Sequence, residues 1–182
     1  MLKKKILTWP NFFTLLRLFC IPVFVYILFV LNERLIAAWL LGLLGATDWV
    51  DGWIARKFDQ RTDFGAVFDP SVDRLLFFVA VPSIIIDGSV PLWVAGVALL
   101  RELGVALVAV LTYLAHKDVM KVSNAGKTGA FFLMFAFPMF LGSYSGASYA
   151  GALTVLAWLC TIPGILFGYY SLVFEYIPKL KK

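Results

Sequence analysis

The chain has 182 residues, of which 62% are hydrophobic, and its formal net charge is +5. Soluble domains are about 45–50% apolar, so this composition excludes an ordinary soluble domain and indicates an integral membrane protein. The basic residues fall in short stretches between apolar runs, which is typical of membrane topology and argues against a nucleic-acid surface.

Long apolar segments recur along the chain. A bilayer core needs about 20 mostly apolar residues per helix, and six such segments can be drawn. They are predicted at 11–31, 34–57, 65–86, 90–115, 128–144 and 148–174. Polar or turn-forming stretches separate them, and nothing resembles a linker or an internal repeat. The sequence therefore predicts one domain, residues 1–182, that is an all-α integral membrane protein with six transmembrane helices and a short N-terminal interfacial segment.

The lysines and arginines predict the orientation, because basic residues stay on the cytoplasmic side of short loops. With the N-terminus inside, the basic residues of the tails and loops are cytoplasmic, and Arg34 alone lies at the outer face. We therefore expect a multi-pass protein of the cell membrane with both termini in the cytoplasm. Trp9, Tyr169, Tyr170 and Tyr176 are expected in the aromatic belts at the membrane surface.

Two aspartates interrupt the cytoplasmic end of the second predicted helix. Residues three and four apart share a helix face, so Asp48 and Asp51 point the same way. Gly52 and Ala55 continue the stripe with almost no side chain, which lets a bulky phosphate approach the backbone. Arg56 follows and is placed to pair with a phosphate oxygen.

The start of the third predicted helix repeats this arrangement. Gly65, Asp69 and Asp73 follow one another at four-residue spacing and share a face if the helix is already wound there. Pro70 leaves the start of this helix open, because proline is comfortable only in the first turn.

Four carboxylates crowded at a membrane boundary need counter-charge, because each isolated charge there is costly and they repel one another. Hard divalent cations prefer oxygen ligands, and the cluster lacks His and Cys, which argues against zinc. Two Mg²⁺ ions about 3.5–4 Å apart would clamp a phosphoryl group. The alternative, in which the aspartates only mark the membrane boundary and the small residues only pack helices, explains a single aspartate better than four.

The spacing of these residues is D-x2-D-G-x2-A-R-x8-G-x3-D-x3-D, formed by Asp48, Asp51, Gly52, Ala55, Arg56, Gly65, Asp69 and Asp73. It matches the signature of the CDP-alcohol phosphotransferase family, which the chain resembles over nearly its whole length. The resemblance implies two divalent metal ions, Mg²⁺ with Mn²⁺ as an alternative. It also implies a homodimer and the transfer of a lipid phosphate from a CDP-linked lipid to an alcohol, with release of CMP.

Carried over, Asp48, Asp51 and Asp69 resemble metal ligands, and Asp73 resembles the general base, near or sharing the second metal. The positions that resemble the CDP-lipid contacts are Gly52, Arg56, Thr62 and Gly65. Thr62 is equally a candidate helix N-cap.

The front of the first predicted helix resembles the family's P-N-x-x-T-x-x-R entry. Asn11, Thr14 and Arg17 recur at three-residue spacing and share a face. They either bind the phosphates of the lipid or anchor the helix at the headgroups, and the resemblance favours the substrate.

Three basic residues are candidates for binding the acceptor. Arg101 lies with Glu102 well inside the fourth predicted helix, where an ionisable residue indicates a functional site. The alternative is that the two neutralise each other or Arg74. Lys127 opens the fifth helix beside its first amides, which suits an anion, although a lone cytoplasmic lysine also serves topology. Arg61 adds to the same cytoplasmic charge.

These residues favour glycerol 3-phosphate as acceptor, because Gly126-Lys127-Thr128 and the Arg101-Glu102 pair look similar to bacterial phosphatidylglycerophosphate synthases. The fuller G-K-x-K-T pattern of those enzymes lacks its second lysine here. Cardiolipin synthases, which accept phosphatidylglycerol, and inositol-phosphate transferases therefore remain alternatives within the family.

The sequence thus predicts an Mg²⁺-dependent membrane enzyme of phospholipid biosynthesis that moves the phosphatidyl group of CDP-diacylglycerol to a glycerol-type acceptor. The rival of another class is a divalent cation carrier, since intramembrane carboxylates also mark ion pathways. A pathway distributes acids across the membrane, whereas the four motif aspartates cluster at one face, which favours the enzyme.

Overall fold

The computed structural model describes residues 9–57, 63–116 and 123–178, and within them the side chains of 12–47, 68, 71–115 and 123–178. Every regular element in this part of the chain is a helix, which confirms the all-α prediction. The elements are α1 (Trp9–Phe29), α2 (Arg34–Lys57), α3 (Asp63–Asp87), α4 (Leu92–His116), α5 (Asn124–Ser143), α6 (Ala150–Tyr170) and the π-helix η1 (Ser171–Tyr176).

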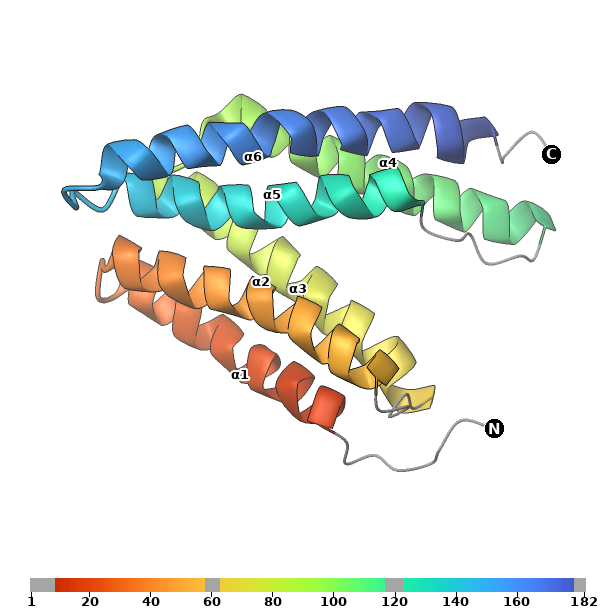
Figure 1. Ribbon diagram of the computed structural model, residues 1–182, viewed down its shortest axis with the longest axis horizontal. Coiled ribbons are helices and arrows are strands. Elements are labelled where there is room, and N and C mark those ends of the chain that lie inside the picture. Colours follow the sequence, from red (N-terminus) through yellow and green to blue (C-terminus); the bar gives the residue numbers. More distant parts are fainter. Residues whose placement is uncertain (1–8, 58–62, 117–122, 179–182) are drawn as a thin grey trace.

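The helices form two groups that meet at one end of the molecule and separate toward the other (Figure 1). Helix α1 packs against α2 and α3, α5 packs against α6 and α2, and α4 contacts α6 and η1. The two aspartate-bearing segments, the last turns of α2 and the first turns of α3, lie at the open end, which we call the aspartate end. The opposite end, where α2 begins, is called the Arg34 end.

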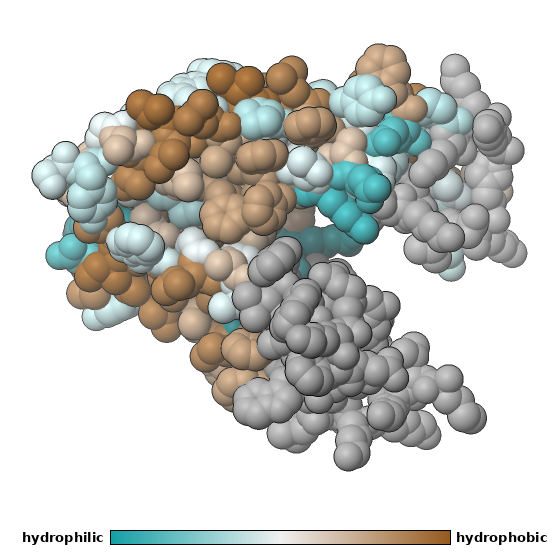
Figure 2. Space-filling view, viewed as in Figure 1, coloured by the Kyte–Doolittle hydropathy of each residue, from teal (hydrophilic) through white to brown (hydrophobic). Residues whose placement is uncertain are grey.

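Within the residues that the structure describes, four helical stretches are long and apolar enough to cross a membrane: Phe12–Phe29, Leu92–Ala115, Asn124–Ser143 and Ala150–Tyr176. The apolar part of α2, Arg34–Thr47, is shorter. Large apolar side chains are exposed along these helices, as the hydrophobic surface in Figure 2 shows. The chain is therefore a multi-pass membrane protein, while the six spans stay a prediction.

The observed helix bounds differ from the predicted ones mainly where a helix has a cap or changes its helix type, which the apolar pattern does not reveal. Helix α3 is already wound at Asp63, so Pro70 lies in its interior rather than in its first turn. Helix α5 begins at Asn124, earlier than the predicted residue 128, because Ser123 caps it and its hydroxyl accepts the Gly126 N–H at 3.0 Å. The sixth predicted helix ends as α-helix at Tyr170 and continues as the π-helix η1.

One aromatic-belt prediction is wrong. Tyr176 is fully buried, because its hydroxyl bonds to the start of α5 instead of facing the membrane surface. Tyr169 is half-buried and donates to the Val97 carbonyl at 2.9 Å, while Tyr170 is exposed as expected. The side chain of Trp9 lies outside the described residues.

Helices α5 and α6 cross at a contact made by glycines. A Cβ on Gly129 would lie 2.6 Å from the Gly168 nitrogen and 3.0 Å from the Gly164 oxygen, so neither backbone leaves room for a side chain. Gly164 and Gly168 are four apart and share a face of α6. Small residues at this spacing let membrane helices approach closely and gain dispersion contacts.

We expect Gly129→Ala to be destabilising, because the added methyl group meets backbone atoms that cannot rotate away. Overpacking of this kind costs about 1–3 kcal/mol. Thermal unfolding of the purified protein in detergent measures it. Gly96→Ala in α4 is the matched control, since a Cβ there meets nothing within 4 Å. An equal loss of stability in both variants would contradict the close crossing.

The Arg34 end is tied together by an ion pair. The Nε of Arg34 lies 3.0 Å from Oδ2 and 3.2 Å from Oδ1 of Asp87, which joins the start of α2 to the end of α3. Ser89 donates its hydroxyl to the same carboxylate. The arginine side chain is 41% exposed and the Asp87 side chain 10%, so solvent reaches this pair from the arginine side.

Candidate active site

The central observation at the candidate site is an ion pair between α1 and α3. Nη1 of Arg17 donates to Oδ1 of Asp73, 56 residues further along the chain. The arginine side chain is 1% exposed, whereas that of Asp73 is 37% exposed. Thr14, one turn before Arg17, is also buried. The face of α1 that carries the predicted P-N-x-x-T-x-x-R residues therefore turns toward the predicted general base.

The same contact fixes the orientation of α3. Because α3 is helical from Asp63 onward, Gly65, Asp69 and Asp73 occupy one face at four-residue spacing. The contact with Arg17 places the Asp73 side chain against α1. The side chains of Gly65 and Asp69 lie outside the described residues.

Helix α2 contributes the other two predicted ligands. Asp48 and Asp51 lie in its last ten residues, and α2 packs along α1 as α3 does. Their side chains lie outside the described residues, as do those of Gly52 and Arg56. The backbone therefore brings the acidic stretches of α2 and α3 to the same end of the molecule, on helices that both contact α1 (Figure 1).

The donor set fits a hard divalent cation. Its members are carboxylates on two helices, and Mg²⁺ is commonly held by one or two carboxylates plus substrate phosphates. Asp73 supplies a carboxylate that is 37% exposed. Among the described side chains no three metal-ligating groups lie together, and Asp73 is the one predicted ligand that belongs to them.

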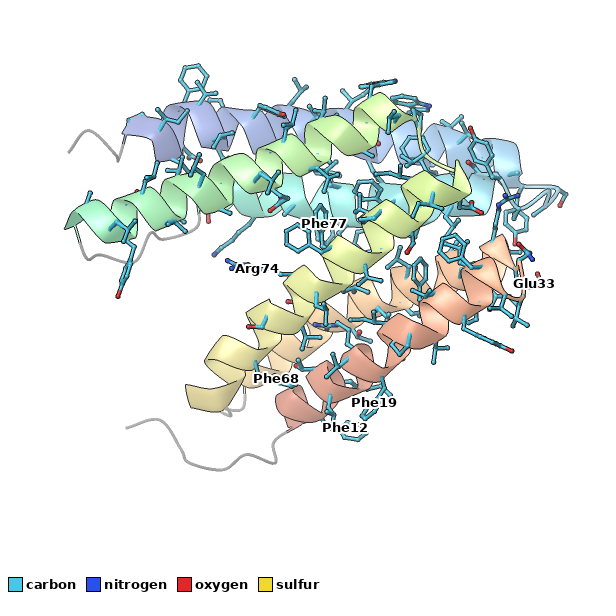
Figure 3. All side chains as sticks on the ribbon, turned by 180° about the vertical axis from the view of Figure 1, so that it is seen from behind. Phe12, Phe19, Glu33, Phe68, Arg74 and Phe77 are labelled. Atoms are coloured by element: carbon cyan, nitrogen blue, oxygen red, sulfur yellow. The ribbon has the colours of Figure 1, made fainter. Side chains whose placement is uncertain are left out.

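A hollow lies next to α3, below α5. Figure 2 shows hydrophilic side chains gathered in it beneath α5, toward the aspartate end. Arg74 is exposed and extends from α3 toward α4 and α5 (Figure 3). One turn further, the Phe77 ring meets the Phe137 ring of α5, with centroids 6.3 Å apart, so α3 and α5 are in contact there. Helix α3 thus carries Asp73 toward α1 and Arg74 into the hollow.

Arg101 is buried inside the group of α4, α5 and α6, with 4% exposure. Its Nη2 donates to the Gly126 carbonyl at 2.9 Å, and its Nη1 pairs with Glu102, whose side chain is 32% exposed. The Nε of Arg101 packs against Gly168, where a Cβ would lie 3.0 Å away. The pairing with Glu102 is the alternative that the sequence left open, and two of the arginine's nitrogens are committed to protein oxygens.

Lys127 is exposed in the first turn of α5, next to the carbonyl that Arg101 holds. Its backbone N–H donates to the Ser123 carbonyl at 3.0 Å, as expected for a capped helix start. An exposed ammonium at this position, on the helix next to the hollow, suits an anionic group of a substrate.

Several predicted contacts cannot be placed. Arg61 and Thr62 lie outside the described residues, and so does the side chain of Asn11. Their roles stay predictions. Arg74 is the residue that the sequence reasoning did not assign to the site. A charged side chain inside a predicted span was the available signal, since such residues indicate functional sites by default.

Comparison with known proteins agrees with the motif. The family model described as CDP-alcohol phosphatidyltransferase matches residues 7–163. The chain is similar to a protein of Mycobacterium tuberculosis named "Putative cardiolipin synthase", with 31% identity over 98% of this chain and 90% of that protein. A second M. tuberculosis protein, named "Probable phosphatidylglycerophosphate synthase", is 32% identical over 85% of this chain and 76% of its own length. A Rickettsia felis protein named "CDP-diacylglycerol--glycerol-3-phosphate 3-phosphatidyltransferase" is 32% identical over 88% and 91%.

Proposed function

Because the chain belongs to the CDP-alcohol phosphatidyltransferase family, and is therefore a membrane-bound transferase of phospholipid biosynthesis, we propose that it moves the phosphatidyl group of CDP-diacylglycerol to glycerol 3-phosphate. Members of this family use a CDP-alcohol and an alcohol acceptor, and they depend in general on divalent metal ions. The Arg17–Asp73 pair is the observation that carries the proposal, because it joins the two stretches of the chain that resemble the family's substrate and metal motifs.

The ligands proposed for two Mg²⁺ ions are Asp48, Asp51, Asp69 and Asp73. When bound, such ions neutralise the pyrophosphate and stabilise the negative charge that develops on the departing CMP. Mn²⁺ has the same preference for carboxylate oxygens and is the alternative. The remaining contributions come from the side chains of the protein.

In the proposed reaction the acceptor hydroxyl attacks the phosphorus atom on the lipid side of the pyrophosphate. Asp73 takes the proton of that hydroxyl as the new P–O bond forms, and the bond to CMP breaks. The carboxylate is suited to this role because it is partly exposed, while Arg17 fixes one of its oxygens from the buried side. The residues proposed to hold the CDP-lipid are Asn11, Thr14, Arg17, Gly52, Arg56, Thr62 and Gly65.

The acceptor is proposed to enter the hollow next to α3. Arg74 and Lys127 are exposed on helices that border it, so a phosphate monoester would meet two cations there. Arg101 is proposed to support this site from within, since it already holds the Gly126 carbonyl beside Lys127. Arg61 is proposed to add positive charge nearby.

Phosphatidylglycerol is the second candidate acceptor, which would make the product cardiolipin. Two observations favour it. The relative matched over 98% of this chain is named a putative cardiolipin synthase, and the charge of Arg101 is partly neutralised by Glu102. A diester acceptor needs fewer cations than a monoester does.

The positive-inside distribution of lysine and arginine supports a cytoplasmic aspartate end, with both termini inside a cell membrane. We also propose a homodimer, which the resemblance to the family supports.

The test is an acceptor panel with the purified chain in detergent. We expect CMP release from CDP-diacylglycerol with Mg²⁺ and glycerol 3-phosphate, and a product with the mass of phosphatidylglycerophosphate. Phosphatidylglycerol, an inositol phosphate and serine form the other arms. If only phosphatidylglycerol gives a product, phosphatidylglycerol is the acceptor and glycerol 3-phosphate is not. If no arm releases CMP and metal ions instead enter vesicles that contain the protein, the cation carrier is favoured.

A further inference from the structure

The last helical segment, η1 (Ser171–Tyr176), changes which residues face the protein. Ser171 and Tyr176 are both fully buried, whereas Phe174 between them is 68% exposed. At 3.6 residues per turn, an α-helix would rotate Tyr176 by about 140° away from Ser171. The i to i+5 hydrogen bonding of a π-helix, which widens the turn, brings residue i+5 back to the side of residue i. The π-helical segment is therefore what directs Tyr176 inward.

Tyr176 bonds to the residue that caps α5. Its hydroxyl accepts the Ser123 N–H at 2.9 Å. Ser123 in turn accepts the Gly126 N–H on its hydroxyl, at 3.0 Å, and the Lys127 N–H on its carbonyl, at 3.0 Å. The buried Tyr176 hydroxyl thus holds Ser123, the residue that accepts the N–H groups of the first turn of α5.

The space at Gly126 shows how closely Tyr176 fits this turn. A Cβ on Gly126 would lie 2.5 Å from the Tyr176 hydroxyl and 3.1 Å from the Ser123 hydroxyl. Arg101 holds the carbonyl of the same glycine from α4. The first turn of α5 is therefore fixed by Tyr176 on one side and by Arg101 on the other. The Lys127 side chain in this turn remains exposed.

We propose that Tyr176 is a positioning residue for the acceptor site. It fixes the amino end of α5 and so keeps the Lys127 ammonium at the border of the hollow, where the phosphate of the acceptor binds. This inference rests on the proposed function, and it adds to it a residue of the C-terminal π-helical segment that does not touch the substrate.

The test is Tyr176→Phe, which removes one oxygen and retains the buried ring. We expect the KM for glycerol 3-phosphate to rise about threefold to tenfold, the ratio that corresponds to one hydrogen bond. The kcat and the KM for CDP-diacylglycerol should stay unchanged, which a general loss of folded enzyme would not produce. In a Lys127→Gln background the same change should raise the KM no further, because the two residues act through one contact.

Tyr169→Phe is the matched control. Its hydroxyl also bonds to a backbone group, the Val97 carbonyl at 2.9 Å, but it joins α6 to α4 without reaching α5. We expect its KM for the acceptor to equal that of the wild type. An unchanged KM in Tyr176→Phe, an equal rise in Tyr169→Phe, or a rise that persists in the Lys127→Gln background would each overturn the positioning role.

Amide hydrogen exchange at Ser123 provides a readout that does not need turnover. Exchange should be faster in Tyr176→Phe than in the wild type or in Tyr169→Phe, and unchanged exchange would overturn the contact itself. Absence of CMP release by the wild type with every acceptor would instead overturn the proposed function. If phosphatidylglycerol proves to be the acceptor, its KM replaces that of glycerol 3-phosphate in the same comparison.

Discussion

Asp73→Asn is expected to lower turnover about 10²- to 10⁴-fold, the contribution of a positioned general base. The amide is nearly the same size as the carboxylate, and its oxygen still accepts from Arg17, so the contact between α1 and α3 is retained. What the amide cannot do is take the proton of the acceptor hydroxyl. CMP release at saturating substrate concentrations measures the loss, and binding of CDP-diacylglycerol in the presence of Mg²⁺ should stay close to that of the wild type.

Asp87→Asn is the control for this variant. Asp87 is likewise a residue of α3 that forms an ion pair with another helix, through Arg34 of α2. It lies at the opposite end of α3 from the candidate site. We expect turnover like that of the wild type. If Asp73→Asn turned over as fast as Asp87→Asn, Asp73 would lose its proposed role as base. If it lost CDP-lipid binding as well, its role as a metal ligand would account for the effect.

Arg17→Gln is expected to have the largest effect on stability and on CDP-lipid binding together. Removing one partner of a buried ion pair costs about 3–5 kcal/mol. We expect the lower end of that range, because water reaches the Asp73 side chain, which is 37% exposed. The lost charge should also weaken binding of CDP-diacylglycerol, since Arg17 lies on the face of α1 proposed to meet the lipid phosphates. Thermal unfolding and the KM for CDP-diacylglycerol measure the two effects.

Arg34→Gln makes the same chemical change in the pair at the Arg34 end. The Arg34 side chain is 41% exposed and that of Asp87 10%, and Ser89 still donates its hydroxyl to the carboxylate when Arg34 is removed. We therefore expect a smaller loss of stability than in Arg17→Gln and no change in KM. Similar unfolding temperatures for the two variants would show that Arg17 is not held as the structure places it. A stable Arg17→Gln enzyme with an unchanged KM would remove Arg17 from the substrate site.

The local part of the candidate site could be predicted from the sequence, because helical spacing alone decides which neighbours share a face. The four-residue steps from Gly65 to Asp73 are an example, and the structure winds α3 through Pro70 as those steps require. The wrong prediction for Tyr176 came from a different argument, the tendency of tyrosines near the end of a span to lie in the aromatic belt. The π-helical segment that accompanies its burial has no local sequence signal that could have corrected the prediction.

The sequence by itself determined that this protein is an all-α membrane protein with its four motif aspartates toward one end, since both follow from composition and from spacing along the chain. Only the tertiary structure decided that Arg17 meets Asp73, that Arg101 is enclosed against Gly168, and that Tyr176 holds the start of α5. The physical reason is that lipid is as apolar as a helix interface, so hydrophobic periodicity does not reveal which face of a membrane helix packs against which neighbour. Those pairings depend on close fits and on single hydrogen bonds between helices far apart in the chain.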